Sequence, residues 1–378
     1  MTLPFSTAVR LVSGLLLTAC GDSSPATPVT DAGGSADAGS EVPLTIGEGF
    51  KPGIAVDAAG TAYLAWYGPE TVTSSLQFCR LPRGAKACDI RKAIPALGTS
   101  LTRPFVTVAS SRVRVVSYRY GLTGDRFDAV YSYTSTDGGA SFDAGRQIGS
   151  APYDDAVQGP GDTISLATDA YSFGEVFEND AADATAPPLQ RAILSTDHPY
   201  SGSVGLIDAA TPLVVFANGT GDAQFRRYKG SGSLNDIASW SAAQDIGHDE
   251  YMHLAGGPLG LFLQARSAAN TLEVRRFDGT TFGPGVDIPE GTGELPQSHL
   301  FQSAGSRFHA VWPRIAADGI RLYYATSEDG TTWKSRLVLT SPDNVASLRV
   351  ASPADNVAVA AWEGPGPTVR VLTLGAAK

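Results

Sequence analysis

The stretch Ser306–Leu339, SRFHAVWPRIAADGIRLYYATSEDGTTWKSRLVL, carries the pattern that decides the fold. It begins with a short apolar strand ending at Trp312 and continues, after a loop, with a second strand over Ile320–Thr326. Polar and apolar residues alternate in this second strand, as expected for a sheet with two different faces. A Ser-Glu-Asp-Gly turn closed by Trp333 then leads into a last strand, Lys334–Leu339. The stretch therefore predicts an antiparallel meander of short strands.

The strand that ends in a large residue recurs along the whole chain. These strands end at Trp66, Tyr118, Phe177, Phe216, Leu263, Trp312 and Trp362. They are spaced roughly 40 to 60 residues apart, the length of a four-stranded propeller blade. Each is preceded and followed by another short apolar strand. We therefore predict an all-β fold, a seven-bladed β-propeller with four-stranded antiparallel blades.

The two ends of the repeat region complement each other. The last unit stops after a third strand, Thr368–Leu374, whereas Val42–Ile46 precedes the first unit and resembles a closing strand. We expect this N-terminal strand to complete the last blade and close the ring, which leaves no open sheet edge for aggregation.

The third unit is the least regular. Its inner strand is predicted at Thr163–Thr168, its second strand ends at Phe177, and its third is Leu189–Ser195. The segment that follows is short for an outer strand, so this blade is expected to have three strands.

Composition supports a β protein and argues against several functions. The 378 residues include 42 Gly and 24 Pro, and 17% are charged, which suits short strands joined by turns. The net charge of −10 argues against nucleic acid or anionic lipid as a partner. No Gly-x-Ser-x-Gly, His-Glu-x-x-His, Gly-Lys-Ser/Thr or Cys-x-x-Cys motif is present. No cofactor is predicted.

The N-terminus has the features of a targeting segment. Arg10 is followed by an apolar run, Leu11–Leu17, and then by Thr-Ala-Cys ending at Cys20. The run is too short to span a bilayer as a helix. The segment resembles a bacterial lipoprotein leader, which implies cleavage before Cys20 and lipidation of that cysteine. A chance cysteine after an ordinary signal peptide is the alternative.

The resemblance also implies a location and a domain plan. In lipoproteins an Asp directly after the lipidated Cys favours the inner membrane, and here Gly21 stands there, so the outer membrane is expected. Residues 21–41 hold almost no large apolar residue and are expected to form a disordered tether. We thus predict a signal peptide over 1–19, a lipidated tether over 20–41 and the propeller over 42–378. The protein is expected to be a monomer that touches the membrane only through its lipid.

Two further cysteines lie in SLQFCRLPRGAKACDIRKAI. If Ser75–Leu81 and Cys88–Ile94 are neighbouring antiparallel strands, Cys79 and Cys88 face each other across the hairpin. An exported protein meets an oxidising compartment, so we predict a disulfide. A metal site would need further Cys or His nearby, and thiol catalysis would need a placed base.

Three turns carry a recognisable motif. Ser135–Phe142, STDGGASF, matches the Asp-box pattern Ser-x-Asp-x-Gly-x-x-aromatic of sialidase-like, BNR-repeat propellers. Ser327–Trp333 is one residue shorter, and Phe277–Phe282 is shorter still. In such turns the Asp accepts backbone N–H groups and the aromatic ring packs beneath the turn, away from the family's active site. We therefore expect structural roles for Ser135, Asp137, Phe142, Asp278, Asp329 and Trp333.

The resemblance also implies what an active member would contain. Family enzymes use three arginines that bind a carboxylate, a Tyr nucleophile with a Glu partner, and an Asp acid/base. The first arginine usually lies in a Phe/Tyr-Arg-Ile-Pro motif before the first blade. Here that region, Glu41–Pro52, reads EVPLTIGEGFKP and holds no Arg, so the chain departs from the enzyme pattern.

A ligand site is expected at one mouth of the central channel, where the loops leading into the inner strands meet the loops that join the second and third strands. The candidate ligand-binding residues are Arg103, Tyr153, Asp154, Asp155, Tyr251, His253, Arg266, His299 and Arg314. The arginines suit an anionic ligand. The two histidines could bind metal or simply line the channel, bonded to water or backbone.

The acidic residues lie in the long loop predicted over Gly149–Asp162. Their carboxylates could contact sugar, form a glycosidase acid/base pair or bind calcium. A solvated acidic loop is the alternative.

The leading hypothesis is a membrane-anchored lipoprotein whose propeller binds a glycan or protein ligand without catalysis. The alternative is a sialidase-like glycoside hydrolase using Asp154, Asp155 or Tyr153, which requires two carboxyl groups about 5–9.5 Å apart. A scaffold in an envelope assembly is a third possibility, and it predicts an exposed apolar patch.

Overall fold

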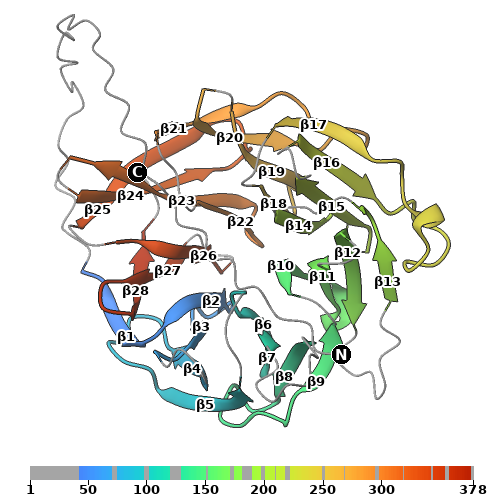
Figure 1. Cartoon of the computed structure of the whole chain (residues 1–378). Coiled ribbons are helices and arrows are strands. Elements are labelled where there is room, and N and C mark those ends of the chain that lie inside the picture. Colours follow the sequence, from blue (N-terminus) through green and yellow to red (C-terminus); the bar gives the residue numbers. More distant parts are fainter. Residues whose placement is uncertain are drawn as a thin grey trace, which may run out of the picture. The chain divides into compact units, whose positions relative to one another are not determined.

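The computed structural model shows seven four-stranded antiparallel sheets arranged as the blades of a β-propeller (Figure 1). The propeller belongs to the second of two compact units, Gly39–Lys378. The structure describes residues 42–69, 75–97, 102–119, 129–149, 152–170, 174–180, 190–196, 201–208, 210–217, 222–248, 252–267, 269–293, 298–317, 319–341, 344–353 and 357–375.

Each blade consists of an inner strand, a second, a third and an outer strand, and blades 1 to 7 are numbered here in the order of their inner strands. The inner strands are β2 (Phe50–Val56), β6 (Phe105–Ala109), β10 (Tyr153–Gln158), β14 (Ser201–Leu206), β18 (His253–Gly257), β22 (His299–Ser303) and β26 (Ala346–Ala351). The second strands are β3 (Ala62–Tyr67), β7 (Arg112–Arg119), β11 (Ile164–Ala170), β15 (Pro212–Ala217), β19 (Gly260–Arg266), β23 (Arg307–Ala316) and β27 (Ala358–Gly364).

The third and outer strands complete each blade away from the channel. The third strands are β4 (Ser75–Leu81), β8 (Ala129–Ser135), β12 (Gly174–Asp180), β16 (Asp222–Arg227), β20 (Thr271–Arg276), β24 (Gly319–Ser327) and β28 (Thr368–Leu374). The outer strands are β5 (Ile90–Leu97), β9 (Arg146–Gly149), β13 (Gln190–Ile193), β17 (Gln244–His248), β21 (Val286–Thr292), β25 (Trp333–Ser341) and β1 (Leu44–Glu48). The only helices among the described residues are two single turns, η1 (Pro160–Asp162) and η2 (Ile237–Ser239).

The hydrophobic core lies between neighbouring blades. The large residues that mark the repeat are buried there, with Trp66 and Trp312 at 0% exposure and Trp362 at 1%. Trp66 packs in one cluster with Val359 and Val369, which belong to blade 7. Each such aromatic ring removes about 150–250 Å² from water. The regular spacing of these residues thus reflects one buried anchor in each blade.

The sheet of blade 7 contains strands from both ends of the propeller. β1 pairs antiparallel with β28, with Leu44 opposite Val371 and Glu48 opposite Thr368. The side chain of Ile46 is buried in the cluster between blades 7 and 1. The N-terminal strand therefore occupies the outer position of the last blade.

Blade 3 differs from the sequence prediction. It has four strands rather than three, and every predicted strand lies one position further out than expected. The inner strand is β10, which the sequence placed in a loop. The prediction failed because β10 reads YDDAVQ and precedes a Gly-Pro-Gly turn. An inner strand borders a polar channel, so it does not need the apolar pattern of a buried strand.

The predicted disulfide is present. Cys79 on β4 is bonded to Cys88, and their Cα atoms are 5.5 Å apart. The predicted signal peptide, Cys20 and the tether lie outside the described residues. Within the described part of the chain, no helix is long and apolar enough to cross a membrane.

The aspartates of two motif turns accept bonds from their own turns. Asp137 accepts the N–H of Ser141 at 2.9 Å and the hydroxyl of Ser135 at 2.7 Å. Asp329 accepts two backbone N–H groups, each at 2.7 Å. The ring of Phe142 packs edge-on against Phe78 of the neighbouring blade, with centroids 5.0 Å apart. These turns therefore connect local hydrogen bonding to packing between blades.

The third motif turn is shorter but similar. Asp278 accepts the backbone N–H groups of Thr280 and Thr281 at 2.7 and 2.9 Å. In the turn of blade 6, Trp333 packs on Phe308 with ring centroids 5.9 Å apart.

Candidate functional site

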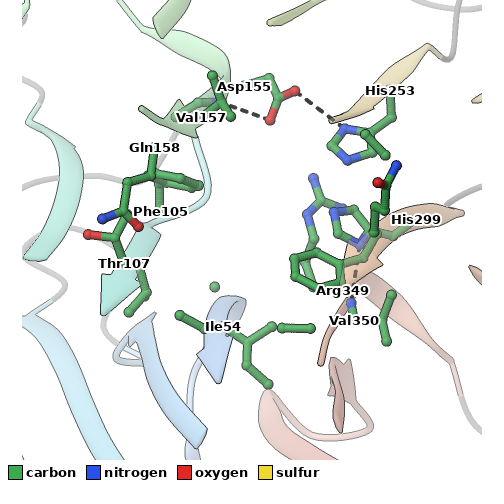
Figure 2. Close-up of a pocket in the computed structure, with 18 of the residues that line it drawn as sticks. Ile54, Phe105, Thr107, Asp155, Val157, Gln158, His253, His299, Arg349 and Val350 are labelled. Atoms are coloured by element: carbon green, nitrogen blue, oxygen red, sulfur yellow. Dashed lines mark hydrogen bonds and ion pairs between the residues drawn. The ribbon is translucent and has the colours of Figure 1, made fainter. Parts of the chain in front are cut away.

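The central channel holds a cavity of about 580 Å³ lined by residues of the inner strands. Apolar and polar groups share its wall. Figure 2 shows the polar side chains of Asp155, His253, His299 and Arg349 on one side, with Ile54, Phe105 and Thr107 facing them. A mixed apolar and polar lining of this size is typical of small-ligand sites.

A β-bulge in β10 directs Asp155 toward blade 4. Tyr153 and Asp155 face consecutive residues of β11, so Asp154 is the extra residue. The bulge reverses the alternation of side chains. Tyr153 and Ala156 consequently pack together in the cluster between blades 2 and 3. Asp155 lies on the opposite face, toward β14 and β18. An alternation read from the sequence alone would have placed Asp155 beside Tyr153.

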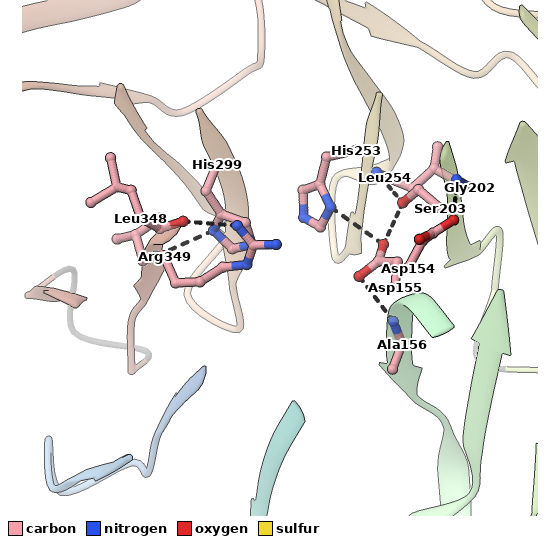
Figure 3. A network of polar contacts seen from close by, with 11 residues as sticks. Asp154, Asp155, Ala156, Gly202, Ser203, His253, Leu254, His299, Leu348 and Arg349 are labelled. Carbon is pink, nitrogen blue, oxygen red and sulfur yellow. Dashed lines mark hydrogen bonds and ion pairs between the residues drawn. The ribbon is translucent and has the colours of Figure 1, made fainter. Parts of the chain in front are cut away.

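Asp155 is held by contacts from two neighbouring inner strands. One carboxylate oxygen accepts the N–H of Ala156 at 2.9 Å, and the other accepts the hydroxyl of Ser203 on β14. The same second oxygen lies 3.3 Å from Nδ1 of His253 on β18. Ser203 in turn accepts the N–H of Leu254 at 2.9 Å. Figure 3 shows this network, which links blades 3, 4 and 5.

Asp154 is also bonded across the blades. One of its carboxylate oxygens accepts the N–H of Gly202 at 3.0 Å, while the residue remains exposed. Asp154 and Asp155 are the only carboxylates among the described residues that line the cavity.

The two histidines are in contact with each other. The ring centroids of His253 and His299 are 4.4 Å apart. Nδ1 of His299 accepts the N–H of Val350 at 3.2 Å, so the proton of the neutral ring is on Nε2. Burial, and then the nearby His253 and Arg103, hold the pKa of His299 well below its ordinary value. His299 is therefore a neutral hydrogen-bond donor at neutral pH.

Arg103 brings a positive charge to the mouth. Burial lowers the pKa of its guanidinium to about 10, and the nearby Asp155 carboxylate opposes this effect. The group is therefore still charged at neutral pH. Its Nε atom is buried and has no hydrogen-bond partner among the described residues.

Tyr153 helps to position Arg103 and is not placed to position a ligand. Its hydroxyl bonds the backbone oxygens of Arg103 and Val116, and the side chain is 3% exposed. Burial raises the pKa of Tyr153 well above its ordinary value. A buried, protonated hydroxyl that is already bonded is poorly suited to act as a nucleophile.

Two of the predicted ligand residues, Arg314 and Arg266, are described by the structure and do not line this cavity. Arg314 lies outside the lining and forms an ion pair with Glu290 at 3.4 Å. Arg266 ends β19 and does not line the cavity either. Both residues lie within second strands, β19 and β23, which are further from the channel axis than the inner strands. Tyr251 lies outside the described residues.

Sequence reasoning missed Arg349 and Ser203. They lie on the inner strands β26 and β14, respectively. Arg349 follows a bulge in which Ser347 has a φ of 55°. One of its Nη atoms donates to the backbone oxygen of Leu348 at 2.8 Å. The available signal was a charged residue inside an otherwise apolar inner strand.

The arrangement offers anion binding and proton transfer. Two guanidinium groups, one carboxylate–imidazole pair and one neutral imidazole line the same cavity. Among the described residues, no group of three or more His, Cys, Asp or Glu is placed to hold a metal ion. The possible calcium site therefore gains no support from the described part of the chain.

Comparisons with known proteins identify the fold alone. No family model and no curated protein matches the sequence. A PL25 ulvan lyase bound to -[GlcA(1-4)Rha3S]- aligns with a TM-score of 0.57 and 11% identity, covering 89% of this chain and 96% of the other. YCF48 bound to the D1 peptide aligns with a TM-score of 0.52 and 10% identity, covering 89% and 96%.

The Hadza microbial sialidase Hz136 has a TM-score of 0.47 and 11% identity, covering 86% of this chain and 65% of the other. That score is too low to support more than a general likeness. The chain is thus a β-propeller similar in fold to the ulvan lyase and to YCF48. The sialidase-like turns remain a resemblance in sequence.

Proposed function

We propose that this chain is a lipid-anchored envelope protein whose propeller binds an acidic glycan at the channel mouth. One observation carries the proposal: Arg103 and Arg349 line the same cavity, and neither forms an ion pair with a described residue. A partly buried cation without a counter-ion is costly. A carboxylate or sulfate of the ligand would balance the charge of these guanidinium groups and accept short, charge-assisted hydrogen bonds from them.

The rest of the lining suits a sugar. Asp155, Gln158 and His253 offer acceptors and donors for hydroxyl groups, while Ile54 and Phe105 offer apolar surface for the C–H faces of a ring. A protein of this fold, the ulvan lyase, binds a glucuronate-containing glycan, which supports a glycan ligand. Another, YCF48, binds a peptide, so a protein ligand with an acidic side chain is the second candidate.

Glycoside hydrolysis is less well supported. The two-carboxylate mechanism places its acids on opposite sides of the scissile bond. Asp154 and Asp155 are consecutive residues of β10, and both already accept hydrogen bonds from blade 4. The hydroxyl of Tyr153 is occupied by backbone oxygens. No pair of described lining carboxylates faces the other across the cavity.

The binding test uses the full chain and a matched pair of ligands. Calorimetry would compare an oligogalacturonide with its methyl ester, which has the same sugar ring but no charge. We expect the ester to bind about tenfold more weakly or worse, because it cannot form the charge-assisted bonds to arginine. Arg349→Gln should weaken binding of the acidic form only, while Arg314→Gln, outside the cavity, should leave it unchanged. Equal affinity for both ligands, or no binding of either, would contradict the proposal.

The anchor is tested separately at Cys20. In cells that process lipoproteins, the wild-type chain should sediment with membranes and release a diacylglyceryl-modified N-terminal peptide. Cys20→Ser should abolish the diacylglyceryl modification, because the thiol that carries the lipid is gone. An unlipidated wild-type chain would contradict the anchor without affecting the binding proposal.

A further inference from the structure

Asp155 and His253 have the arrangement of an oriented general base. Nδ1 of His253 faces the Asp155 carboxylate at 3.3 Å. A neutral imidazole that donates its Nδ1–H to a carboxylate keeps the lone pair on Nε2 free to accept a proton. The carboxylate also stabilises the imidazolium that forms when the proton arrives. Figure 3 shows the pair at the channel wall.

The supporting contacts make this pair rigid. Asp155 is bonded by Ala156 of its own strand and by Ser203 of blade 4, and Ser203 is fixed by the N–H of Leu254 next to His253. A base whose partner is held both by its own strand and by a neighbouring strand keeps its orientation when a ligand binds. Asp155 is therefore a positioning residue, and His253 is the group that would meet the ligand.

His299 and the arginines supply the complementary electrophilic groups. His299 is fixed as the Nε2–H tautomer by the N–H of Val350. A neutral imidazole of this kind can donate a hydrogen bond without surrendering its proton. Arg103 and Arg349 line the same cavity and would neutralise a ligand carboxylate.

These groups fit some reactions better than others. Nucleophilic catalysis is not favoured, because no described hydroxyl or thiol is bonded to His253: Ser203 bonds Asp155 instead, and Cys79 and Cys88 form a disulfide. Two-carboxylate hydrolysis lacks facing acids. Abstraction of a proton next to a carboxylate needs one base and a cationic site that stabilises the resulting negative charge. Both are present.

We propose that the cavity catalyses β-elimination in a 4-linked uronate glycan, a proposal that rests on acidic-glycan binding at this site. Nε2 of His253 takes the proton from C5 of the uronate, beside the carboxylate held by Arg103 and Arg349. The C5–H electron pair becomes the C4–C5 double bond, and the C4–O bond breaks. The departing oxygen receives the proton back from the His253 imidazolium. No water, metal or redox partner is consumed.

A purely structural role for the network makes a different prediction. Contacts from Asp155 to Val350 run through blades 3, 4, 5, 6 and 7 and could serve only to hold the inner strands together. In that case substitution of His253 would lower the free energy of unfolding, and the wild-type chain would catalyse no elimination. The chemical readout separates the two roles.

The test is an assay of the full chain with the acidic oligogalacturonide used for binding. We expect ultraviolet absorbance from the new conjugated double bond, and products whose masses sum to that of the substrate without added water. His253→Asn retains a donor at the position of Nδ1 for Asp155 but lacks the Nε2 base. It should lose about 100-fold or more in rate, with binding changed by less than about threefold. Arg314→Gln is the matched control and should keep the wild-type rate.

Each other result has a defined meaning. Tight binding without unsaturated product overturns the elimination and leaves the binding proposal standing. Products that have gained water also overturn it, because they show hydrolysis. Full turnover by His253→Asn would exclude His253 as the base. Failure of the wild-type chain to bind the acidic ligand overturns the proposed function, and the elimination with it.

Discussion

The aspartates of the motif turns and Asp155 of the channel are the same residue type in opposite settings. Asp137 accepts the N–H of a residue only four positions away, and Asp329 does so two and three positions away. Asp155 accepts a hydroxyl from Ser203, 48 residues away on another blade, and contacts His253 on a third. The turn aspartates thus serve local structure, whereas Asp155 depends on the assembled ring.

The largest expected effect is a loss of folding stability at acidic pH, which comes from a buried histidine and not from the turn aspartates. His309 on β23 is fully buried, with Nδ1 2.8 Å from the hydroxyl of Tyr324. Burial, and then Arg307, lower its pKa to about 4. The unfolded chain takes up this proton near pH 6.5 while the folded chain resists it, so stability is full above about pH 6.5 and falls as the pH drops toward 4. The loss through His309 should be about 3 kcal/mol.

Urea unfolding of wild type and His309→Gln at neutral pH and at pH 4 measures this contribution. The variant should lose less stability than wild type on acidification. The turn aspartates should not contribute in this window, since hydrogen bonds from Ser141 and Ser135 lower the pKa of Asp137 to about 2. The stability that the turn aspartates contribute is lost only as the pH falls from about 4 toward 2. Parallel pH curves for the two proteins would contradict the assignment.

The disulfide should have the next largest effect. It closes a short loop within the hairpin of β4 and β5, with a sequence separation of 9. Loop-closure entropy for such a length gives about 2–3 kcal/mol. The double variant Cys79→Ala/Cys88→Ala should lose about this much in the free energy of unfolding. Reducing agent should shift the wild-type urea midpoint and leave the variant's midpoint unchanged. A wild-type midpoint unaffected by reduction would contradict the prediction.

The same contrast explains how far the sequence could be read. Strands of six blades and the disulfide followed from local patterns, because a strand anchored by Trp66 or Trp312 and a turn such as Ser327–Trp333 have signatures within a few residues. Blade 3 was misread because the polar inner strand β10 has no such signature. At the site, His253, His299 and Arg103 were expected at the mouth.

The spatial arrangement that brings these residues together in the cavity could not be predicted from the sequence. The bulge at Asp154 sets which face Asp155 occupies, and a bulge depends on pairing with β11. Arg349 reaches the cavity because blade 7 follows blade 6 around the ring. Conversely, Arg314 looked equivalent to Arg103 in the sequence, but lies on a second strand beside Glu290. Distance from the channel axis, which distinguishes them, is a property of the assembled ring.

A smaller loss is expected when a turn aspartate is removed. Asp329→Ala deletes the acceptor for two backbone N–H groups and for Ser327. We expect a loss of about 1–2 kcal/mol in the free energy of unfolding. Glu328→Ala, at the adjacent exposed position, should cost less than about 0.5 kcal/mol. Ligand affinity should be unchanged in both variants, because neither residue lines the cavity. A loss of affinity in Asp329→Ala would show that the turn influences the mouth.

Asp155→Asn should have a small effect on stability and the sharpest effect on function. Asparagine has nearly the same shape and can still accept the N–H of Ala156, so unfolding should change by about 1 kcal/mol or less. Its amide cannot accept a hydrogen bond at the nitrogen that replaces one carboxylate oxygen. If that nitrogen faces His253, the imidazole is driven to the other tautomer and Nε2 is no longer a base. The elimination rate should then fall by about 100-fold while the urea midpoint barely moves. If Asp155→Asn instead unfolds the ring and leaves specific activity of the remaining folded protein intact, Asp155 belongs with Asp137 and Asp329 as a structural residue.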